Sequence, residues 1–209
     1  KVSKFLLISS GEIYGDPAIV PTPETYTGNL NPIGPRSAYQ ESKRFAETLC
    51  YIYSVSCGVN AVIARLYHTY GPRLSLTDGR VVSEFIRRAM QEEKIEVVNT
   101  ESTRTFSYIS DSIEAMWRVL LLGKPGQAYN VGSEEEIDIR GLAELIVEIA
   151  ESRSSVTIIP SKNIPHSIAT PTKATPSVLK IEELGHSNKI SIEHGLKRLI
   201  DWYKNQEAS

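Results

Sequence analysis

Two runs of apolar residues, separated by a segment with helical periodicity, constrain the fold of this chain more than any other feature. The runs at residues 4–9 (KFLLIS) and 59–66 (VNAVIARL) are continuous rather than alternating, as is typical of strands buried on both faces of a parallel sheet. Between them, apolar residues recur at helical spacing over residues 37–57, with Ser37 as the expected N-cap. This order of strand, helix and strand predicts an α/β fold with a parallel sheet.

The rest of the chain continues the alternation. Further helices are expected at residues 79–91, 111–122, 139–151, 177–184 and 191–205, and further strands at 95–98, 127–131 and 156–159. Ser110 or Asp111 is the expected N-cap of one helix and Asp138 that of another. Residues 15–36, rich in proline and glycine, form a long loop of the kind that is often functional, and residues 160–176 show no clear period.

Composition excludes several classes of protein. The chain has 23 Lys and Arg against 25 Asp and Glu, a formal net charge of -2 and no basic run, so no nucleic-acid partner is expected. No segment approaches the ~18 apolar residues of a membrane span, and no membrane partner or metal is expected. On one helix, Cys50 and Cys57 would lie about 10 Å apart, too far for a disulfide. Two reduced cysteines favour a cytoplasmic protein.

The sharpest local motif is YQESK, which runs from Tyr39 to Lys43 at the start of the first expected helix. A spacing of four residues places the two side chains on one helix face. A free tyrosine has a pKa near 10, and a nearby ammonium group lowers that pKa, so the pair can act as a general base. The pattern alone is not specific, because such a pair also occurs by chance on an exposed helix face.

Other motifs follow in a recognisable order. A strand end with hydroxyls and a glutamate, SSGEIYG at residues 9–15, precedes Tyr39 by about thirty residues. It is followed by YGDP, NPIGPRSAYQESK, IARLYHTYGPR, DGRVVSEFI, TRTFSYISD and YNVGS. This series resembles the extended branch of the short-chain dehydrogenase/reductase family, the NAD-dependent epimerases and dehydratases. Within it, NPIGPR, DGRVVS and residues 102–111 are most similar to the UDP-glucuronate decarboxylases. The resemblance covers residues 4 to about 150 and is weak beyond about 160.

The resemblance implies an enzyme that modifies a sugar nucleotide with NAD through a 4-keto sugar. Tyr39 would take the proton of the sugar 4-hydroxyl while NAD takes hydride from C4. Ser10 would hydrogen-bond that hydroxyl, and Lys43 would support Tyr39 and bind the cofactor. Glu12 would assist the next step, which is loss of CO2 from a C5 carboxylate in a decarboxylase. A 4,6-dehydratase or an epimerase is the near alternative.

The same resemblance implies residues that bind cofactor and substrate. Tyr67 lies in the loop that would run beneath the nicotinamide, and His68 falls where the family holds the sugar nucleotide. Arg104 would face the carboxylate or the diphosphate of a UDP- or dTDP-linked sugar, which a guanidinium can bind through two hydrogen bonds.

The helix at residues 37–57 commonly forms a dimer interface in enzymes of this branch. The resemblance therefore implies a homodimer, with Tyr51, Ile52 and Val55 as candidate contacts. The alternative is that these three side chains pack inside the domain.

Three departures from the family pattern leave the substrate open. Gly11 stands where the decarboxylases have a serine and the common dehydratases an aspartate, and glycine supplies no proton. His68 replaces the usual asparagine, and an imidazole differs from an amide in shape. Residues 173–177 (KATPS) replace an Arg-x-Pro-Asp signature, so the arginine that would hold the nucleotide is missing.

The family's Gly-x-x-Gly-x-x-Gly loop, which cradles the NAD pyrophosphate, is not found among the 13 glycines. The chain is therefore expected to be the C-terminal two-thirds of a longer enzyme. We expect residues 1–75 to be part of a Rossmann-like NAD-binding domain, with 105–125 packing back on it and 76–209 forming mainly a smaller substrate-binding lobe. A non-catalytic remnant that binds a sugar nucleotide is the alternative from another class. A reductase of small carbonyls is disfavoured, because the extended-branch motifs continue past residue 100.

Overall fold

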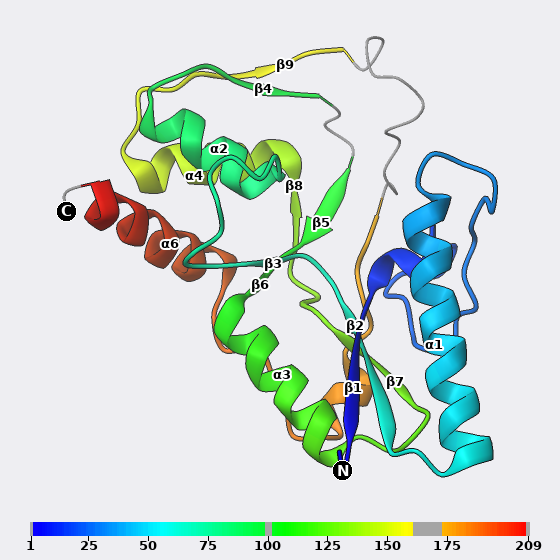
Figure 1. Cartoon of the computed structure of the whole chain (residues 1–209). Helices are drawn as coiled ribbons and strands as arrows, with labels where there is room; N and C mark the ends of the chain where they lie inside the picture. Colours follow the sequence, from blue (N-terminus) through cyan, green and yellow to red (C-terminus); the bar gives the residue numbers. More distant parts are fainter. Residues whose placement is uncertain (1, 99–101, 161–172, 208–209) are drawn as a thin grey trace.

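The computed structural model describes residues 2–98, 102–160 and 173–207 and confirms the expected α/β fold. A parallel sheet in the order β1-β2-β7 lies at its centre. Its elements are β1 (Phe5–Ser10), β2 (Ala61–Leu66) and β7 (Ala128–Val131), with helices α1 (Ser37–Cys57) and α3 (Ile109–Leu122) beside it. Figure 1 shows α1 on one side of this sheet and α3 on the other. The parallel strands end together, so the loops that follow β1 and β2 meet at one edge.

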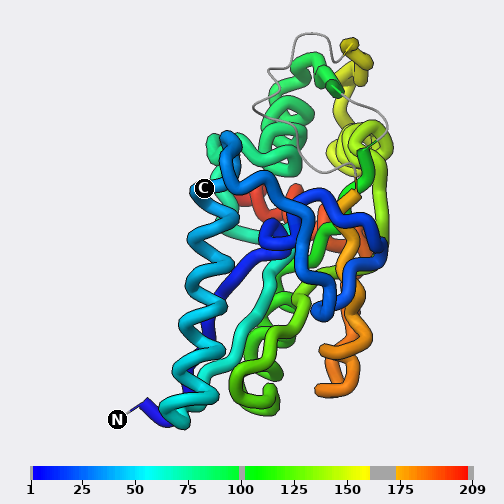
Figure 2. The backbone as a smooth tube through the Cα atoms, turned by 90° about the vertical axis from the view of Figure 1, so that its right-hand side faces the viewer, coloured from blue at the N-terminus to red at the C-terminus, as the bar shows by residue number. Residues whose placement is uncertain are grey.

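The second part of the molecule lies above the sheet in Figures 1 and 2. It contains α2 (Val81–Met90), α4 (Ile139–Ala150), α6 (Ile192–Glu207) and the parallel pair β4 (Ile95–Val97) and β9 (Val156–Ile158). Five further elements are the parallel pair β3 (Thr69–Tyr70) and β6 (Ser107–Tyr108), the antiparallel pair β5 (Thr103–Thr105) and β8 (Glu136–Asp138), and the helix α5 (Leu179–Glu182). The helix expected at 177–184 is thus shorter than predicted.

Two hydrophobic cores stabilise these parts. The core beneath α3 and α5 includes Val62, Ala64, Val119, Tyr129 and Ile181. The core of the second part includes Ile86, Ile95, Leu142, Ile146 and Leu196. Each fully buried aliphatic side chain stabilises the fold by about 1.5–3 kcal/mol relative to its exposed state. The strands and helices whose apolar residues form these cores therefore lie where the sequence pattern predicts them.

Helix α1 is attached to the sheet by polar side chains rather than by an apolar face. Gln40 and Glu47 are its buried residues. By contrast, Phe45, Leu49 and Ile52 are 64%, 39% and 46% exposed. The helical spacing of these apolar residues predicts the helix correctly, but the face that they define points to solvent.

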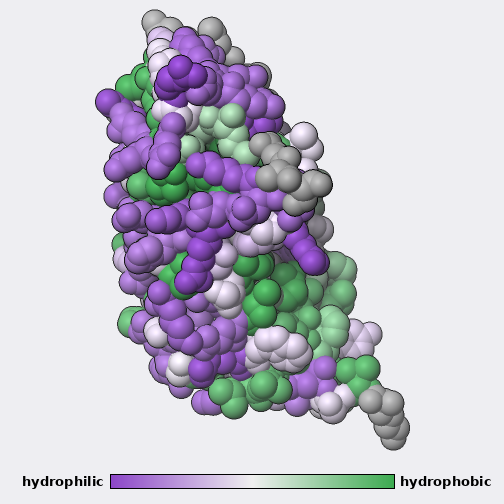
Figure 3. All heavy atoms as spheres, turned by 90° about the vertical axis from the view of Figure 1, so that its left-hand side faces the viewer, coloured by the Kyte–Doolittle hydropathy of each residue, from purple (hydrophilic) through white to green (hydrophobic). Residues whose placement is uncertain are grey.

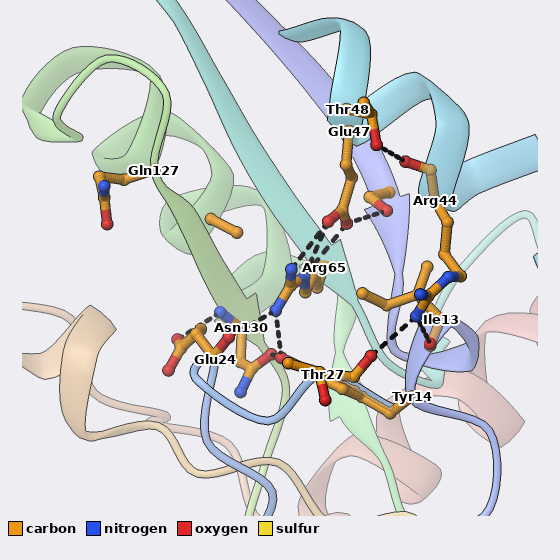
Figure 4. Close-up of polar contacts among 12 residues, drawn as sticks. Ile13, Tyr14, Glu24, Thr27, Arg44, Glu47, Thr48, Arg65, Gln127 and Asn130 are labelled. Carbon is orange, nitrogen blue, oxygen red and sulfur yellow. Dashed lines mark hydrogen bonds and ion pairs between the residues drawn. The ribbon is translucent and has the colours of Figure 1, made fainter. Parts of the chain in front are cut away.

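A buried ion pair anchors α1 to β2. Arg65 Nη2 lies 2.8 Å from Glu47 Oε2, and the two side chains are 12% and 11% exposed. Ser9 donates its hydroxyl to Glu47 Oε1 at 2.5 Å. Arg65 Nη1 also donates to the Tyr14 hydroxyl at 2.6 Å, which in turn donates to Asn130 Oδ1 at 2.8 Å. Figure 4 shows how this network joins α1, β2 and β7.

Burial and hydrogen bonding act together on the groups of this network. Burial raises the pKa of Tyr14 to about 12, although Arg65 opposes the shift. Burial is the largest single effect on Arg65 and lowers its pKa, but the hydrogen bonds and charges of Glu47 and Tyr14 together outweigh burial and raise the pKa. Arg65 and Glu47 are thus held as a charged pair, and Tyr14 is held as a neutral donor.

One predicted helix cap is confirmed and another is wrong. Asp138 caps α4, since its Oδ1 accepts the N–H of Gly141 at 2.8 Å. Ser37 is the first residue of α1 rather than its N-cap, a position that Arg36 takes. The Ser37 hydroxyl donates instead to the carbonyl of Gly34 at 2.6 Å, within the turn that precedes the helix.

Asp111 is also not the N-cap of its helix, because α3 begins at Ile109 after Tyr108. Its carboxylate instead accepts the backbone N–H groups of Lys189 and Ile190, both at 2.9 Å. This contact ties the first turn of α3 to the segment before α6, so a tertiary partner replaces the local one.

Two expectations from composition are compatible with the structure. Cys50 and Cys57 both carry free thiols. No helix in the described part of the chain is long and apolar enough to cross a membrane.

Replacing Tyr14 by phenylalanine should lower the free energy of unfolding by about 1–3 kcal/mol, because Arg65 and Asn130 each lose a buried partner. Tyr26→Phe is the matched control, since the Tyr26 hydroxyl accepts the N–H of Ala18 at the exposed surface. The control should change stability by less than about 0.5 kcal/mol. Urea denaturation followed by circular dichroism measures both values, and equal losses would contradict the importance of the network.

Candidate functional site

The end of β1 presents Ser10 and Glu12 through a short 3-10 helix, η1 (Gly11–Tyr14). Ser10 is buried, and its hydroxyl oxygen accepts the N–H of Glu12 at 3.2 Å as the N-cap of η1. A hydroxyl that accepts one hydrogen bond retains its own proton for donation. Ser10 therefore has both the structural role of a cap and a proton that it can direct to another molecule.

Glu12 is held against the start of α1. Arg36 Nη2 lies 2.5 Å from Glu12 Oε1, and Arg36 Nε donates to Oε2 at 3.3 Å. Gln40 adds a longer contact to Oε2 at 3.4 Å. The two-point ion pair fixes the plane of the carboxylate, so Glu12 is more than a solvated loop charge.

Tyr39 and Lys43 lie on one face of α1, as the spacing of the motif predicts. Tyr39 is 50% exposed, and Lys43 Nζ lies 5.8 Å from the centre of its ring. Lys43 Nζ donates to the carbonyl oxygen of Ile8 at 2.9 Å. Ile8 is two residues before Ser10, so this hydrogen bond holds the helix face that carries Tyr39 beside the end of β1.

Tyr67 packs closely on the glycine at the start of η1. A Cβ atom at Gly11 would lie 2.6 Å from the Tyr67 ring, closer than such contacts normally come. Burial raises the pKa of Tyr67, so its hydroxyl stays protonated at neutral pH. The ring therefore explains why residue 11 has no side chain, and Tyr67 is suited to packing rather than to proton abstraction.

His68 and Arg104 lie near enough to Glu12 for its charge to act on both. Arg104, on β5, is 7% exposed, and its Nη1 donates to the carbonyl of Thr103 at 2.6 Å. Burial lowers the pKa of Arg104, while the Glu12 carboxylate opposes that change. The His68 ring lies beside Phe106, with 5.5 Å between ring centres.

The His68 imidazole reaches solvent but is surrounded by protein atoms on most sides. This partial loss of hydration lowers the pKa of His68, Arg104 lowers it further, and Glu12 opposes both. His68 is therefore neutral at pH 7 and can donate or accept a hydrogen bond. The charge of Glu12 thus acts on both His68 and Arg104, which makes these three side chains electrostatic neighbours.

The Arg36 and Arg104 guanidinium groups both interact electrostatically with Glu12. Arg36 forms the ion pair with its carboxylate, and Arg36 also contributes to the lowered pKa of Arg104. Guanidinium groups bind carboxylates and phosphates in bidentate fashion, so either could enter beside Glu12.

The segment KATPS packs against Thr22 in the long loop after η1 and against Gly132. The N–H of Thr22 donates to the carbonyl of Thr175 at 2.8 Å. The Pro176 ring lies against Gly132, where a Cβ atom would be 2.7 Å away. The segment thus has a packing role and offers no guanidinium group. Residues 161–172, which make up most of the tract without clear periodicity, lie outside the described residues.

Three residues of this region were missed by sequence reasoning. They are Arg36, Gln40 and Glu47. The signal for Gln40 and Glu47 was available in YQESKRFAE, where polar residues share the helix face of Lys43. Arg36 had no comparable signal, since its partner Glu12 is 24 residues away in the chain.

Gly11→Ala should destabilise the fold by about 1–3 kcal/mol, because the new methyl group would overlap the Tyr67 ring. In a Tyr67→Ala background the same substitution should cost less, since the ring is gone. Gly34→Ala is the control, because a Cβ atom there meets its nearest neighbour at 3.5 Å. Denaturation of the parent, Gly11→Ala, Tyr67→Ala and the double variant gives the coupling energy between positions 11 and 67. Additive losses of stability would refute the contact.

Comparison with known proteins identifies related sequences. The family model described as the NAD dependent epimerase/dehydratase family matches residues 1–132. UDP-glucuronic acid decarboxylase 1 of Arabidopsis thaliana is 38% identical over 206 residues, which are 98% of this chain and 46% of that protein. The enzyme of the same name from Danio rerio is 37% identical and covered to 48% of its length. The chain therefore spans about half the length of the curated relatives it matches.

The fold has close structural relatives as well. UDP-glucose 4-epimerase from Thermotoga maritima, solved with UDP-glucose, superimposes with a TM-score of 0.87 at 25% identity. The match covers 99% of this chain and 65% of that one. The family model spans more than half of the chain, and the motifs that suggested the resemblance fall mostly within it. The chain belongs to the NAD dependent epimerase/dehydratase family.

Proposed function

We propose that this chain supplies the catalytic and substrate-binding residues of an NAD-dependent enzyme that modifies a sugar nucleotide, in a reaction like that of UDP-glucuronate decarboxylase. The proposal is supported by the placement of Ser10 and Glu12 directly after β1, and by the hydrogen bond of Lys43, on the helix face of Tyr39, to the β1 backbone at Ile8. The similarity to UDP-glucuronic acid decarboxylases over 98% of the chain supports the choice of reaction. A UDP-linked sugar is the favoured substrate, with a dTDP-linked sugar as the alternative.

In this proposal Tyr39 is the general base. Tyr39 is half exposed at the start of α1, so a sugar hydroxyl can approach its side chain. Lys43 places a positive charge near the ring and thereby favours the phenolate. Ser10 donates its free proton to the sugar oxygen and so orients the hydroxyl that Tyr39 deprotonates. Bound NAD would supply the hydride acceptor for the carbon that carries this hydroxyl.

Glu12, His68 and Arg104 are the proposed residues for the rest of the substrate. Arg104 binds the carboxylate or the diphosphate, and the neutral imidazole of His68 hydrogen-bonds the sugar nucleotide. Glu12 assists the second step from its fixed position against Arg36. Gly11 supports decarboxylation over 4,6-dehydration, because elimination of water needs a proton donor and Tyr67 fills the space where such a side chain would lie.

The cofactor would contact Tyr39, Lys43 and Tyr67, but the sequence holds no glycine loop for its pyrophosphate. Among the described residues, β1 pairs only with β2, so its other edge is open. Large apolar side chains near that edge, on β1 and α3, are exposed: Phe5, Ile8, Ile113, Trp117 and Leu121. Figure 3 shows an apolar area on the lower part of this face. A polypeptide segment with the glycine loop is proposed to cover it.

This arrangement gives the proposed division of the chain. Residues 1–75, with 105–125 packed on the sheet, form the part that completes an NAD-binding domain. Residues 76–209 contribute mainly the substrate-binding lobe, although β7 belongs to the central sheet and α5 packs against β7. A non-catalytic protein that binds sugar nucleotides is the alternative, and the turnover test below separates the two.

A homodimer through α1 and a cytoplasmic location complete the proposal. Tyr51, Ile52 and Val55 are all exposed on α1, so the alternative that they pack inside this chain is excluded. An apolar helix face that no other described segment covers suits contact with a second copy. The free thiols of Cys50 and Cys57 are compatible with a reducing compartment.

Tyr39→Phe should lower kcat with UDP-glucuronate by about 10²–10⁴-fold, because the phenol that accepts the proton is lost. The assay combines this chain with NAD and the glycine-loop segment of a relative and measures CO2 release. Tyr53→Phe, an exposed tyrosine of the same helix, is the control and should keep full activity. Full turnover by Tyr39→Phe would contradict the catalytic proposal. Absence of turnover in the parent, with sugar-nucleotide binding intact, would favour the non-catalytic alternative.

Ile52→Glu should convert the dimer to a monomer, because it places a charge at the centre of the exposed apolar face of α1. Ile33→Glu is the control, since Ile33 is exposed in the loop before the helix and should leave the dimer intact. Light scattering after size-exclusion chromatography measures the mass of each. A parent protein that is monomeric at every concentration would contradict the proposed interface.

A further inference from the structure

One face of α1 carries three side chains that bear on its contact with β1, and only two of them belong to the YQESK motif. Tyr39, Lys43 and Glu47 follow one another at intervals of four residues, which keeps them on the same helix face. Lys43 binds the carbonyl oxygen of Ile8, and Glu47 binds the hydroxyl of Ser9. Successive turns of the helix thus contact successive residues of the strand, directly before Ser10.

Glu47 is rigidly held at the centre of this contact. Its Oε1 accepts Ser9 Oγ at 2.5 Å and Arg65 Nε at 3.1 Å, while its Oε2 accepts Arg65 Nη2 at 2.8 Å. Arg65 is itself fixed by the Tyr14 hydroxyl and by the carbonyl of Glu24 at 3.1 Å. The labelled side chains of Figure 4 converge on Arg65 between α1 and the strands.

Apolar packing contributes little to the position of α1 over the sheet, although Arg36, Arg44 and Ser54 make further polar contacts. The apolar residues Phe45, Leu49 and Ile52 of the helix are exposed, so they cannot fix its register by packing within the chain. A buried charge that loses its partner is strongly disfavoured, so sliding or rotation of α1 that separates Glu47 from Arg65 is opposed. The polar network therefore selects one placement of the helix.

We propose that Ser9 and Glu47 are positioning residues for Tyr39. Their hydrogen bond, backed by Arg65, fixes the rotation and axial register of α1 over the end of β1 and hence the place of Tyr39 relative to Ser10. The inference rests on the proposed function, which makes this placement matter for proton transfer. A misplacement of about 1 Å between reacting groups can cost about 10²-fold in rate.

The test uses 3-fluorotyrosine at position 39 of the 209-residue chain and follows its fluorine resonance by NMR. Ser9→Ala removes the hydroxyl that binds Glu47 and should shift or broaden the resonance, because Tyr39 samples other positions. Ser54→Ala is the matched control. It also removes a hydroxyl contact from α1 to a strand, to the carbonyl of Ala61 at 3.3 Å, but about 22 Å along the helix from Tyr39. The control should leave the resonance unchanged.

Glu47→Gln should move the resonance in the same direction as Ser9→Ala, provided that circular dichroism shows a folded chain. If Glu47→Gln does not fold, Ser9→Ala against Ser54→Ala decides the question alone. An unchanged resonance in Ser9→Ala, or equal changes in both alanine variants, would overturn the inference. The measurement needs no turnover, so failure of the chain in the turnover assay with NAD and the glycine-loop segment would count against the proposed function without deciding whether Ser9 and Glu47 hold Tyr39 in place.

Discussion

The ion pair between Glu47 and Arg65 is the interaction on which the arrangement of the site depends. It lies between α1 and the central sheet, in a region where apolar packing would normally hold a helix in place. A buried ion pair contributes little net stability compared with an apolar pair, but it disfavours every arrangement that separates its partners. The chain therefore has a helix whose position is specified by hydrogen bonds, with its apolar face left on the surface.

This constraint links the two halves of the proposed chemistry. The proton-transfer residues Tyr39 and Lys43 are on the helix, whereas Ser10 and Glu12 follow the strand, and polar contacts join the two elements at successive levels. Beyond them, Arg104 comes from β5 in a different part of the chain. Reacting groups drawn from separate elements keep their geometry only if those elements are fixed relative to one another.

The exposed apolar surfaces fall on opposite sides of the sheet and fit different neighbours. The face of α1 is continuous along a helix and suits a second copy of the chain, whereas the area beside β1 combines an open strand edge with apolar side chains. An unpaired edge of a parallel strand has hydrogen-bonding groups that another strand can use. That chemistry is compatible with relatives that are about twice as long as this chain.

The sequence by itself determined the α/β order, the strands β1 and β2, the common face of Tyr39 and Lys43, and the cap at Asp138. Each of these depends on periodicity or on contacts within one turn, so local pattern is sufficient. Only the tertiary structure decided the partners of longer-range polar groups. Asp111 binds the backbone 78 and 79 residues away, and Glu47 pairs with Arg65 18 residues away across the helix–sheet boundary. Local propensity carries no information on such partners, because buried polar groups are satisfied by whatever the fold brings within reach.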